Sequence, residues 1–142
     1  MAKNKLNVEF SYDFVLLGII SPLKEYKLAW KINKCLEINL VKEVDVEIEF
    51  FNQSDLVISN FLYQTENSEF RLLKNKSVSS NSRANVYLLP ELQSFDYVVM
   101  VSGFEDTFSI DTVKSELQAI PGVQYIKLFD VESLKSRENL IF

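Results

Sequence analysis

Residues 15–36 read VLLGIISPLKEYKLAWKINKCL, and they indicate the fold class because an apolar run passes directly into a helical pattern. The run from Val15 to Ile20 predicts a buried strand. Gly18 leaves two interpretations open, a second, fully buried strand or a bulged continuation of the segment before it. Ser21-Pro22 predicts a helix start. The serine hydroxyl can accept a hydrogen bond from a free backbone amide of the first turn, and the amide hydrogen that proline lacks has no partner within a helix at that position. We therefore expect a helix over about 22–37.

Apolar residues of this helix recur at intervals of three and four, which predicts a wide buried face that packs across a sheet. The face comprises Leu23, Tyr26, Leu28, Ala29, Trp30, Ile32, Cys35 and Leu36. Cys35 is the only cysteine, so no disulfide can form within the chain. We interpret it as a core residue, because a free cysteine packs like a small hydrophobic side chain.

Alternating apolar and polar residues predict strands on both sides of the helix. Residues 5–14 alternate before it, and residues 43–51 alternate after it. Two further strands, at about 56–64 and 69–74, are separated by residues 65–68, whose sequence Thr-Glu-Asn-Ser is typical of a hairpin turn. We expect an antiparallel meander in the middle of the chain.

The next stretch contains a polar segment between predicted strands. Residues 74–85 read KNKSVSSNSRAN, a composition that predicts a mobile loop. Short strands are expected at 86–89 and at about 97–102, where the second one ends at Gly103.

A second helix and a last strand follow. Ser109 is positioned to cap a helix that ends near Ile120, and a strand is expected over 123–129. Asp130 then opens a brief helix. The order strand, helix, strand from residue 97 to residue 129 resembles half of a ferredoxin-like arrangement, which implies binding or regulation only by analogy.

These elements predict the α+β class, with a mainly antiparallel sheet of about six strands and two main helices in a single layer on that sheet. The chain has 142 residues, of which 47% are hydrophobic, and it contains eleven Phe, six Tyr and one Trp. That content is enough to build one core. No repeat or change of composition marks a boundary, so we expect a single domain over residues 1–142.

Charge and hydropathy restrict the partners. The net charge is −5 and the pI is near 4.8, which disfavours nucleic acid as a partner because a phosphate backbone would be repelled on average. Lys and Arg are scattered, but a local basic patch assembled by folding stays open. We expect no membrane span and no signal peptide, because no apolar run has the required length, and the cytoplasm follows as the expected location.

The residues needed for several common chemistries are missing. The chain contains no histidine, which excludes histidine-based triads and proton relays within one chain. None of the three glycines lies in a phosphate-binding loop pattern, and we expect neither a cofactor nor a metal site. Alternate acidic residues over 43–49 predict a solvated strand face, with binding of a cation or a basic partner as the alternative; they are Glu43, Asp45, Glu47 and Glu49.

Two stretches carry a resemblance to a known family. Residues 89–97 read LPELQSFDY, and the chain closes with LKSRENLIF over residues 134–142. The first stretch resembles the motif of the IPExxxVDY family, with Leu89 in place of Ile and Phe95 in place of Val; the identical positions are Pro90, Glu91, Asp96 and Tyr97. The second resembles the usual ending of that family. The resemblance covers essentially the whole chain and implies a small bacterial protein, without assigning it an activity.

The motif has a structural and a functional interpretation. In the first, Pro90 begins a single helical turn, Leu92 and Phe95 share a buried side, and Asp96 accepts backbone hydrogen bonds as the chain enters the next strand. In the second, the polar residues Glu91, Asp96, Tyr97 and Arg137 line a pocket or a partner surface.

We expect a non-enzymatic protein-interaction or regulatory domain whose partner is another protein or a second copy of the chain, as in a homodimer. The missing catalytic residues and the high aromatic content favour this hypothesis. The alternative is a carboxylate-dependent enzyme or a divalent-cation-binding protein that uses Glu91 and Asp96 or the acidic strand face.

Overall fold

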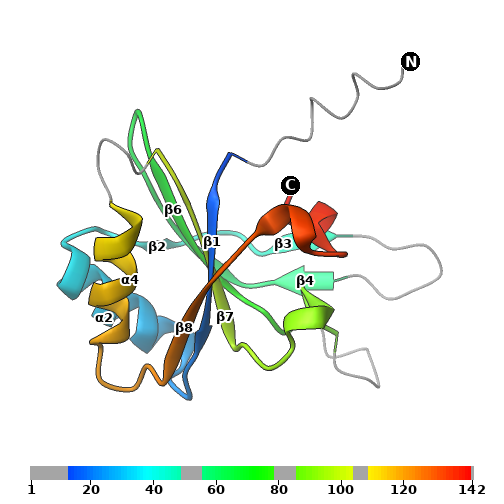
Figure 1. The fold of residues 1–142 in the computed structure, drawn as a ribbon, viewed down its shortest axis with the longest axis horizontal. Helices are drawn as coiled ribbons and strands as arrows, with labels where there is room; N and C mark the ends of the chain where they lie inside the picture. The colour runs from blue at the N-terminus through cyan, green and yellow to red at the C-terminus, as the bar shows by residue number, and fades with distance from the viewer. Residues whose placement is uncertain (1–12, 49–55, 79–85, 104–108, 142) are drawn as a thin grey trace.

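The computed structural model describes residues 13–48, 56–78, 86–103 and 109–141, which are coloured in Figure 1. The strand predicted over 5–14 lies outside the described residues except for its last two positions. Within the described ranges no helix combines the length and the apolar character that crossing a bilayer requires.

The main sheet has six antiparallel strands in the order β2-β5-β6-β7-β1-β8. The strands are β1 (Val15–Ile20), β2 (Val41–Lys42), β5 (Asn60–Gln64), β6 (Glu69–Lys74), β7 (Tyr97–Ser102) and β8 (Tyr125–Phe129). A separate antiparallel pair is formed by β3 (Val46–Ile48) and β4 (Leu56–Ile58). The predicted α+β class is confirmed.

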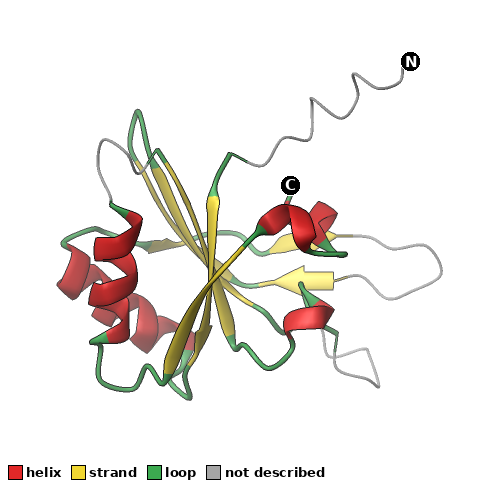
Figure 2. Ribbon diagram, in the orientation of Figure 1, coloured by secondary structure: helices red, strands yellow, loops and turns green. Residues whose placement is uncertain are grey.

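The two helices α2 (Glu25–Leu36) and α4 (Ile110–Gln118) cover one face of this sheet, as Figure 2 shows. The predicted single layer of helices is therefore confirmed. The opposite face carries β3 and β4 together with three 3-10 turns, η1 (Pro90–Leu92), η2 (Val131–Ser133) and η3 (Arg137–Leu140). The sheet is thus the middle layer of three.

Each face of the sheet has its own core. Alternate residues of β7 point to opposite faces, as a strand requires. Tyr97, Val99 and Val101 join the core under the helices, and Val98 and Met100 join the core on the opposite face. Because both faces are covered, a central strand reads as a continuous apolar run rather than an alternating one.

The register of the run at residues 15–20 distinguishes its two interpretations. The pairing with β7 and with β8 is unbroken, so β1 contains no bulge; its four central residues are buried, and Val15 and Ile20 at its ends are partly buried. A Cβ at Gly18 would lie 2.7 Å from the Phe129 ring and 2.8 Å from the Phe95 ring. Glycine is needed here because the two rings pack edge to face against this position, with centroids 5.1 Å apart.

The strand order contains the predicted ferredoxin-like half and a second half that completes the arrangement. β7 and β8 both pair antiparallel with β1, which lies between them, so β7, α4 and β8 form a split β-α-β unit. β6 is parallel to β1 on the other side of β7, and α2 lies in the connection between them. The chain therefore follows a β-α-β-β-α-β path, into which β2 to β5 are inserted after α2.

Several predicted boundaries were wrong. The first helix begins at Glu25, three residues after Pro22, and its cap position is Lys24 instead of Ser21. Ser21 Oγ instead donates to the carbonyl of Gly122 at 2.8 Å and accepts from the Leu23 amide at 3.1 Å. The hydroxyl thus shapes the turn before the helix and ties it to the connection before β8. Ser109 occupies the cap position of α4 without a side-chain cap bond.

Three strand predictions also differ from the structure. The segment 43–51 is a strand only over Val46–Ile48, and the region from 49 onward lies outside the described residues. The segment 56–64 breaks at Ser59 into β4 and β5, which belong to different sheets. Residues 86–89 form no strand, and Tyr87 makes only an isolated bridge with Lys76. By contrast, the predicted hairpin between β5 and β6 and the strands β7 and β8 are confirmed.

Candidate functional site

The motif at residues 89–97 forms a single 3-10 turn that leads into β7. Pro90 begins the turn, as the sequence predicts, and Leu92 and Phe95 are both buried in the core opposite the helices. The predicted turn at Pro90 and the predicted burial of Leu92 and Phe95 are confirmed.

Asn75 holds this motif in place from inside. Its side chain is fully buried, donates to the carbonyls of Leu92 (2.9 Å) and Phe95 (3.0 Å), and accepts from the Leu89 amide (2.9 Å). Its backbone adds bonds with Leu88 and Asp96. The sequence does not indicate this role, because Asn75 lies in the polar segment of residues 74–85, whose composition predicts a mobile loop. Residues 79–85 of that loop lie outside the described part of the chain.

Asp96 and Tyr97 join the motif to the segment before α2. Asp96 accepts from the Ser21 amide at 2.8 Å, so its predicted backbone bond exists but reaches a residue distant in sequence. The Tyr97 hydroxyl donates to the Leu23 carbonyl. Burial, together with the negative charges of Glu25 and Asp96, raises the pKa of Tyr97 to about 12.

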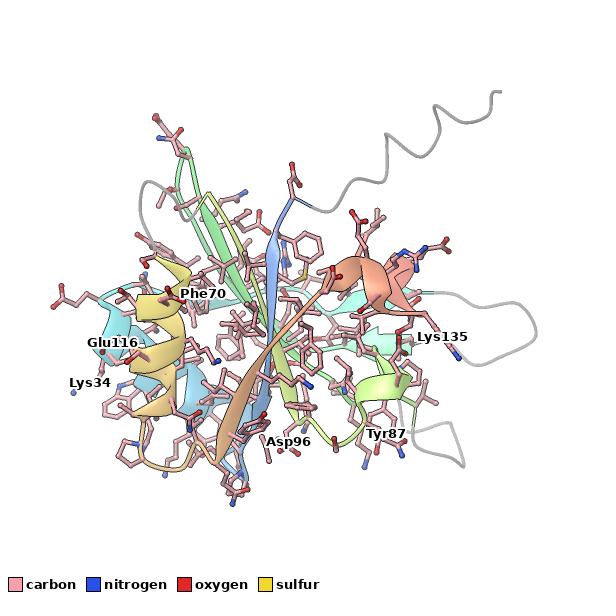
Figure 3. The ribbon with its side chains drawn as sticks, in the orientation of Figure 1. Lys34, Phe70, Tyr87, Asp96, Glu116 and Lys135 are labelled. Atoms are coloured by element: carbon pink, nitrogen blue, oxygen red, sulfur yellow. The ribbon has the colours of Figure 1, made fainter. Side chains whose placement is uncertain are left out.

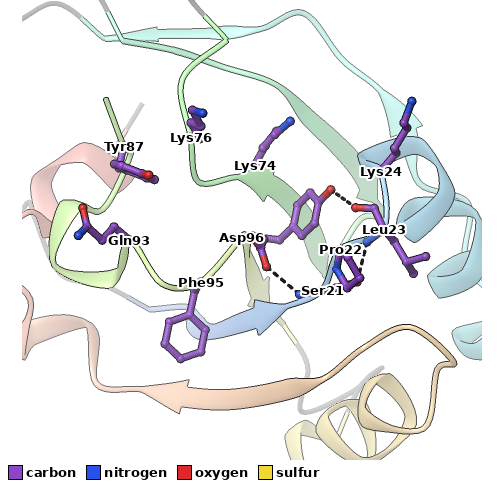
Figure 4. Close-up of a pocket in the computed structure, with 11 residues that line it drawn as sticks. Ser21, Pro22, Leu23, Lys24, Lys74, Lys76, Tyr87, Gln93, Phe95 and Asp96 are labelled. Carbon is purple, nitrogen blue, oxygen red and sulfur yellow. Dashed lines mark hydrogen bonds between the residues drawn. The ribbon is translucent and has the colours of Figure 1, made fainter. Parts of the chain in front are cut away.

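These contacts form one wall of a cleft, which Figure 4 shows in close-up. The cleft has a volume of about 380 Å³, within the range of small-molecule sites. Four segments contribute to it: residues 21–24 before α2, the end of β6, the region of Tyr87 and Gln93, and residues 95–97.

Three lysines line this cleft, namely Lys24, Lys74 and Lys76. We call it the lysine cleft. Within the described part of the chain none of the three belongs to an ion pair. The local basic patch that the sequence left open is therefore present. Lys74 and Lys76 are two residues apart, a spacing that places side chains on one face of an extended segment, but only the fold brings Lys24 beside them.

Glu91 and Arg137 lie outside this cleft. Glu91 accepts from the amide (2.9 Å) and the hydroxyl (2.7 Å) of Ser136, and Arg137 donates to the Leu134 carbonyl (2.8 Å). Burial alone would raise the pKa of Glu91, but the bonds from Ser136 outweigh it and lower the pKa below the usual 4.5. The two stretches that carry the family resemblance are thus in direct contact, and only Asp96 and Tyr97 of the predicted site residues line the cleft.

A second surface lies on the helix layer. The sequence predicted that Tyr26 and Trp30 face the core, but they are 64% and 57% exposed. The predicted apolar face of this helix is therefore wider than the buried face, because the buried residues of α2 are only Leu28, Ala29 and Ile32. Lys34 Nζ lies 4.5 Å from the centre of the Trp30 ring, a cation–π contact one helical turn along.

A groove of about 320 Å³ between α2 and α4 adjoins this aromatic pair. Its lining consists of Trp30, Lys31, Lys34, Cys35, Glu116, Ala119, Ile120 and Pro121. We call Tyr26, Trp30 and this groove the aromatic surface. Figure 3 shows Lys34 and Glu116 at the helix layer, well away from Asp96 and Tyr87 at the lysine cleft. Cys35 is half-buried against the helix-side core, and burial raises the pKa of its thiol.

The carboxylates that could serve a cation are dispersed. Glu43 and Glu47 are exposed, Asp45 pairs with Lys42 at 3.1 Å, and Glu49 lies outside the described residues. Burial raises the pKa of Glu25 although the Ser59 hydroxyl and nearby lysines oppose this. Among the described residues no group of three or more Asp, Glu, Cys or His side chains is arranged to hold a metal ion.

Comparison of the chain with protein-family models, with curated proteins and with solved structures found no match. The resemblance to the IPExxxVDY family consequently stays a prediction that rests on the two stretches quoted above.

Proposed function

We propose that this protein is a non-enzymatic interaction domain that docks an acidic segment of a protein partner on its aromatic surface. The observation that carries the proposal is the exposure of Trp30 and Tyr26 beside a groove between two helices. Leaving two large aromatic rings in water forgoes the gain of burying them, and aromatic side chains are enriched at the centres of interfaces.

The charge of the aromatic surface selects the kind of partner. Lys27, Lys31 and Lys34 lie on α2 around the aromatic pair, while Glu116 is the acidic residue of the groove lining. An acidic segment with one apolar side chain matches this surface, because the apolar group fills the groove and the carboxylates face the ammonium groups.

The same charges argue against self-association through this surface. In a two-fold dimer the same patch meets itself, so the lysines of one copy would face those of the other. Light scattering after size exclusion tests this point. We expect a monomer at micromolar concentration, and a dimer that dissociates when Trp30 is replaced by Ala would contradict the proposal.

Trp30 also provides the assay, because it is the only tryptophan. Titration with a synthetic peptide that carries one Leu among Glu residues should shift the Trp30 emission to the blue as the ring leaves water. The same peptide with Lys in place of Glu should have no effect. A Lys31→Glu/Lys34→Glu variant should lose the response, and Lys114→Glu/Lys127→Glu, with the same change of net charge, is the matched control. Equal responses to the acidic and the basic peptide would contradict the proposal.

Affinity capture then identifies the natural partner. Wild-type protein and the Trp30→Ala variant are compared as baits, since an exposed residue can be truncated with less than about 0.5 kcal/mol of lost stability. A protein retained only by the wild type supports the proposal if its acidic segment, made as a peptide, reproduces the fluorescence shift.

A carboxylate-dependent enzyme or cation site is less well supported. Both oxygens of Glu91 accept bonds from Ser136, and a cation at Glu91 would have to displace them. Thermal unfolding with magnesium or calcium tests this alternative, which requires that a cation raises the melting temperature and that Glu91→Gln or Asp96→Asn removes the rise.

A further inference from the structure

We propose that the lysine cleft binds a small phosphate-bearing molecule. Three lysines, Lys24, Lys74 and Lys76, are among the residues that line the cleft, and Asp96 is the acidic residue of the lining. The chain as a whole has the opposite balance, with a net charge of −5. A cationic cleft on an acidic protein concentrates anions locally while the whole molecule repels long polyanions.

The position of Asp96 leaves the cationic character of the cleft intact. Its Oδ2 accepts from the Ser21 amide at 2.8 Å, and no ion pair joins it to a lysine among the described residues. The residues that line the cleft therefore carry a net positive charge, although the Glu25 carboxylate near the cleft interacts with Lys74. A bound anion neutralises this charge, and a phosphate group with two negative charges neutralises it more than a single carboxylate does.

The walls of the cleft are held in place before any ligand binds. Between Lys74 and Lys76, the buried Asn75 makes three side-chain hydrogen bonds that anchor this segment to the motif. On the other side, Asp96 and Tyr97 bond to the backbone of Ser21 and Leu23, next to Lys24. A preformed site costs little ordering entropy on binding, which favours a specific ligand site over a loose collection of surface charges.

The size and the remaining lining limit the ligand to a small molecule. A cleft of about 380 Å³ holds a small organic phosphate, and it is too small for a nucleic acid duplex. Tyr87 and Gln93 line the end opposite Lys24, as Figure 4 shows. A ring and an amide there suit the organic part of a phosphate ester, which can stack on the first and hydrogen-bond to the second.

This inference is independent of the aromatic surface, because the two sites share no lining residue. Inorganic pyrophosphate is the first probe, measured by calorimetry at low salt on the whole chain. We expect saturable binding with one site, and chemical-shift changes at the amides of Lys76, Tyr87 and Gln93. No binding, or shift changes spread over the whole surface, would overturn the proposal.

Charge variants decide where the anion binds. Lys74→Glu/Lys76→Glu should reduce pyrophosphate affinity at least tenfold, whereas Lys114→Glu/Lys127→Glu, with the same change of net charge, should reduce it less than threefold. An equal loss of pyrophosphate affinity in the two double variants would show a general electrostatic effect and would overturn the proposal. Circular dichroism confirms that each variant folds, and Lys74→Gln/Lys76→Gln provides a milder pair that should also lose binding.

Competing anions decide the chemical class. Pyrophosphate and a phosphate monoester such as glycerol phosphate should bind, and citrate should bind at least tenfold more weakly than pyrophosphate. Citrate binding as tight as that of pyrophosphate would overturn the assignment to phosphate. Duplex DNA that binds with higher affinity than pyrophosphate would overturn the assignment to a small molecule.

Discussion

Replacement of Asn75 by Ala is the most direct test of how the motif is held. The side chain is 0% exposed and makes three hydrogen bonds to the motif backbone. The Leu92 carbonyl keeps a partner after the change, because the Phe95 amide also donates to it at 2.8 Å. The Leu89 amide and the Phe95 carbonyl lose the side-chain partner that Asn75 provides.

These two groups set the expected magnitude. A buried polar group left without a partner costs about 1 to 3 kcal/mol, so we expect Asn75→Ala to lower the free energy of unfolding by about 3 kcal/mol. That is a large fraction of the roughly 5 to 15 kcal/mol that stabilises a typical domain.

Urea unfolding followed by circular dichroism measures this loss. The dependence on urea should keep its slope, so that the change appears in the midpoint. Asn39→Ala is the control, since Asn39 is exposed and its truncation should cost less than about 0.5 kcal/mol. A loss below about 1 kcal/mol for Asn75→Ala would show that water replaces the amide and would contradict the role of Asn75 as the anchor of the motif.

Three further predictions concern single groups. Gly18→Ala should cost about 1 to 3 kcal/mol in urea unfolding, because its Cβ meets two rings, and the cost should fall in a Phe129→Ala background; an unchanged cost there would contradict this cause. In the folded protein Tyr97 should ionise at about pH 12 in an absorbance titration, a step that Tyr97→Phe removes. Its neutral form is favoured by folding, so this stabilisation is present below pH 10 and is lost as the pH rises through about 12; loss of all tyrosine protons near pH 10 would argue against it. Glu91→Gln should lower stability at pH 7 by less than about 1 kcal/mol, because the group is exposed. Folding lowers the pKa of Glu91, so the stability that its carboxylate contributes is present above pH 4.5 and is lost as the pH falls through the lowered pKa. An equal loss of stability for Glu91→Gln at pH 7 and at acidic pH would contradict the role of Ser136.

The class and most elements followed from sequence periodicity. The apolar run at residues 15–20 predicted a buried strand, and the structure places it between β7 and β8 with both faces covered. The turn begun by Pro90 and the buried pair Leu92 and Phe95 were also predicted, because proline geometry and apolar spacing act over a few residues.

Positions that depend on distant contacts were not predictable in this way. Apolar spacing in α2 indicated which residues could be buried, but the tertiary packing leaves Trp30 exposed beside the groove. Ser59 breaks an apparently continuous strand, because the two halves pair with different partners. Local pattern carries no information about which partner a strand meets.

Local sequence patterns are sufficient to predict the α+β class, the central buried strands, the hairpin between β5 and β6, and the turn that begins at Pro90. These features arise from backbone preferences and side-chain periods that act within one element. The folded chain, in contrast, was needed to show that Asn75 anchors the motif and that Glu91 binds Ser136 instead of joining Asp96. It also brought Lys24 beside Lys74 and Lys76. The physical reason is that hydrogen bonds and charge clusters between residues 14 to 75 positions apart depend on how the strands are ordered in the sheet.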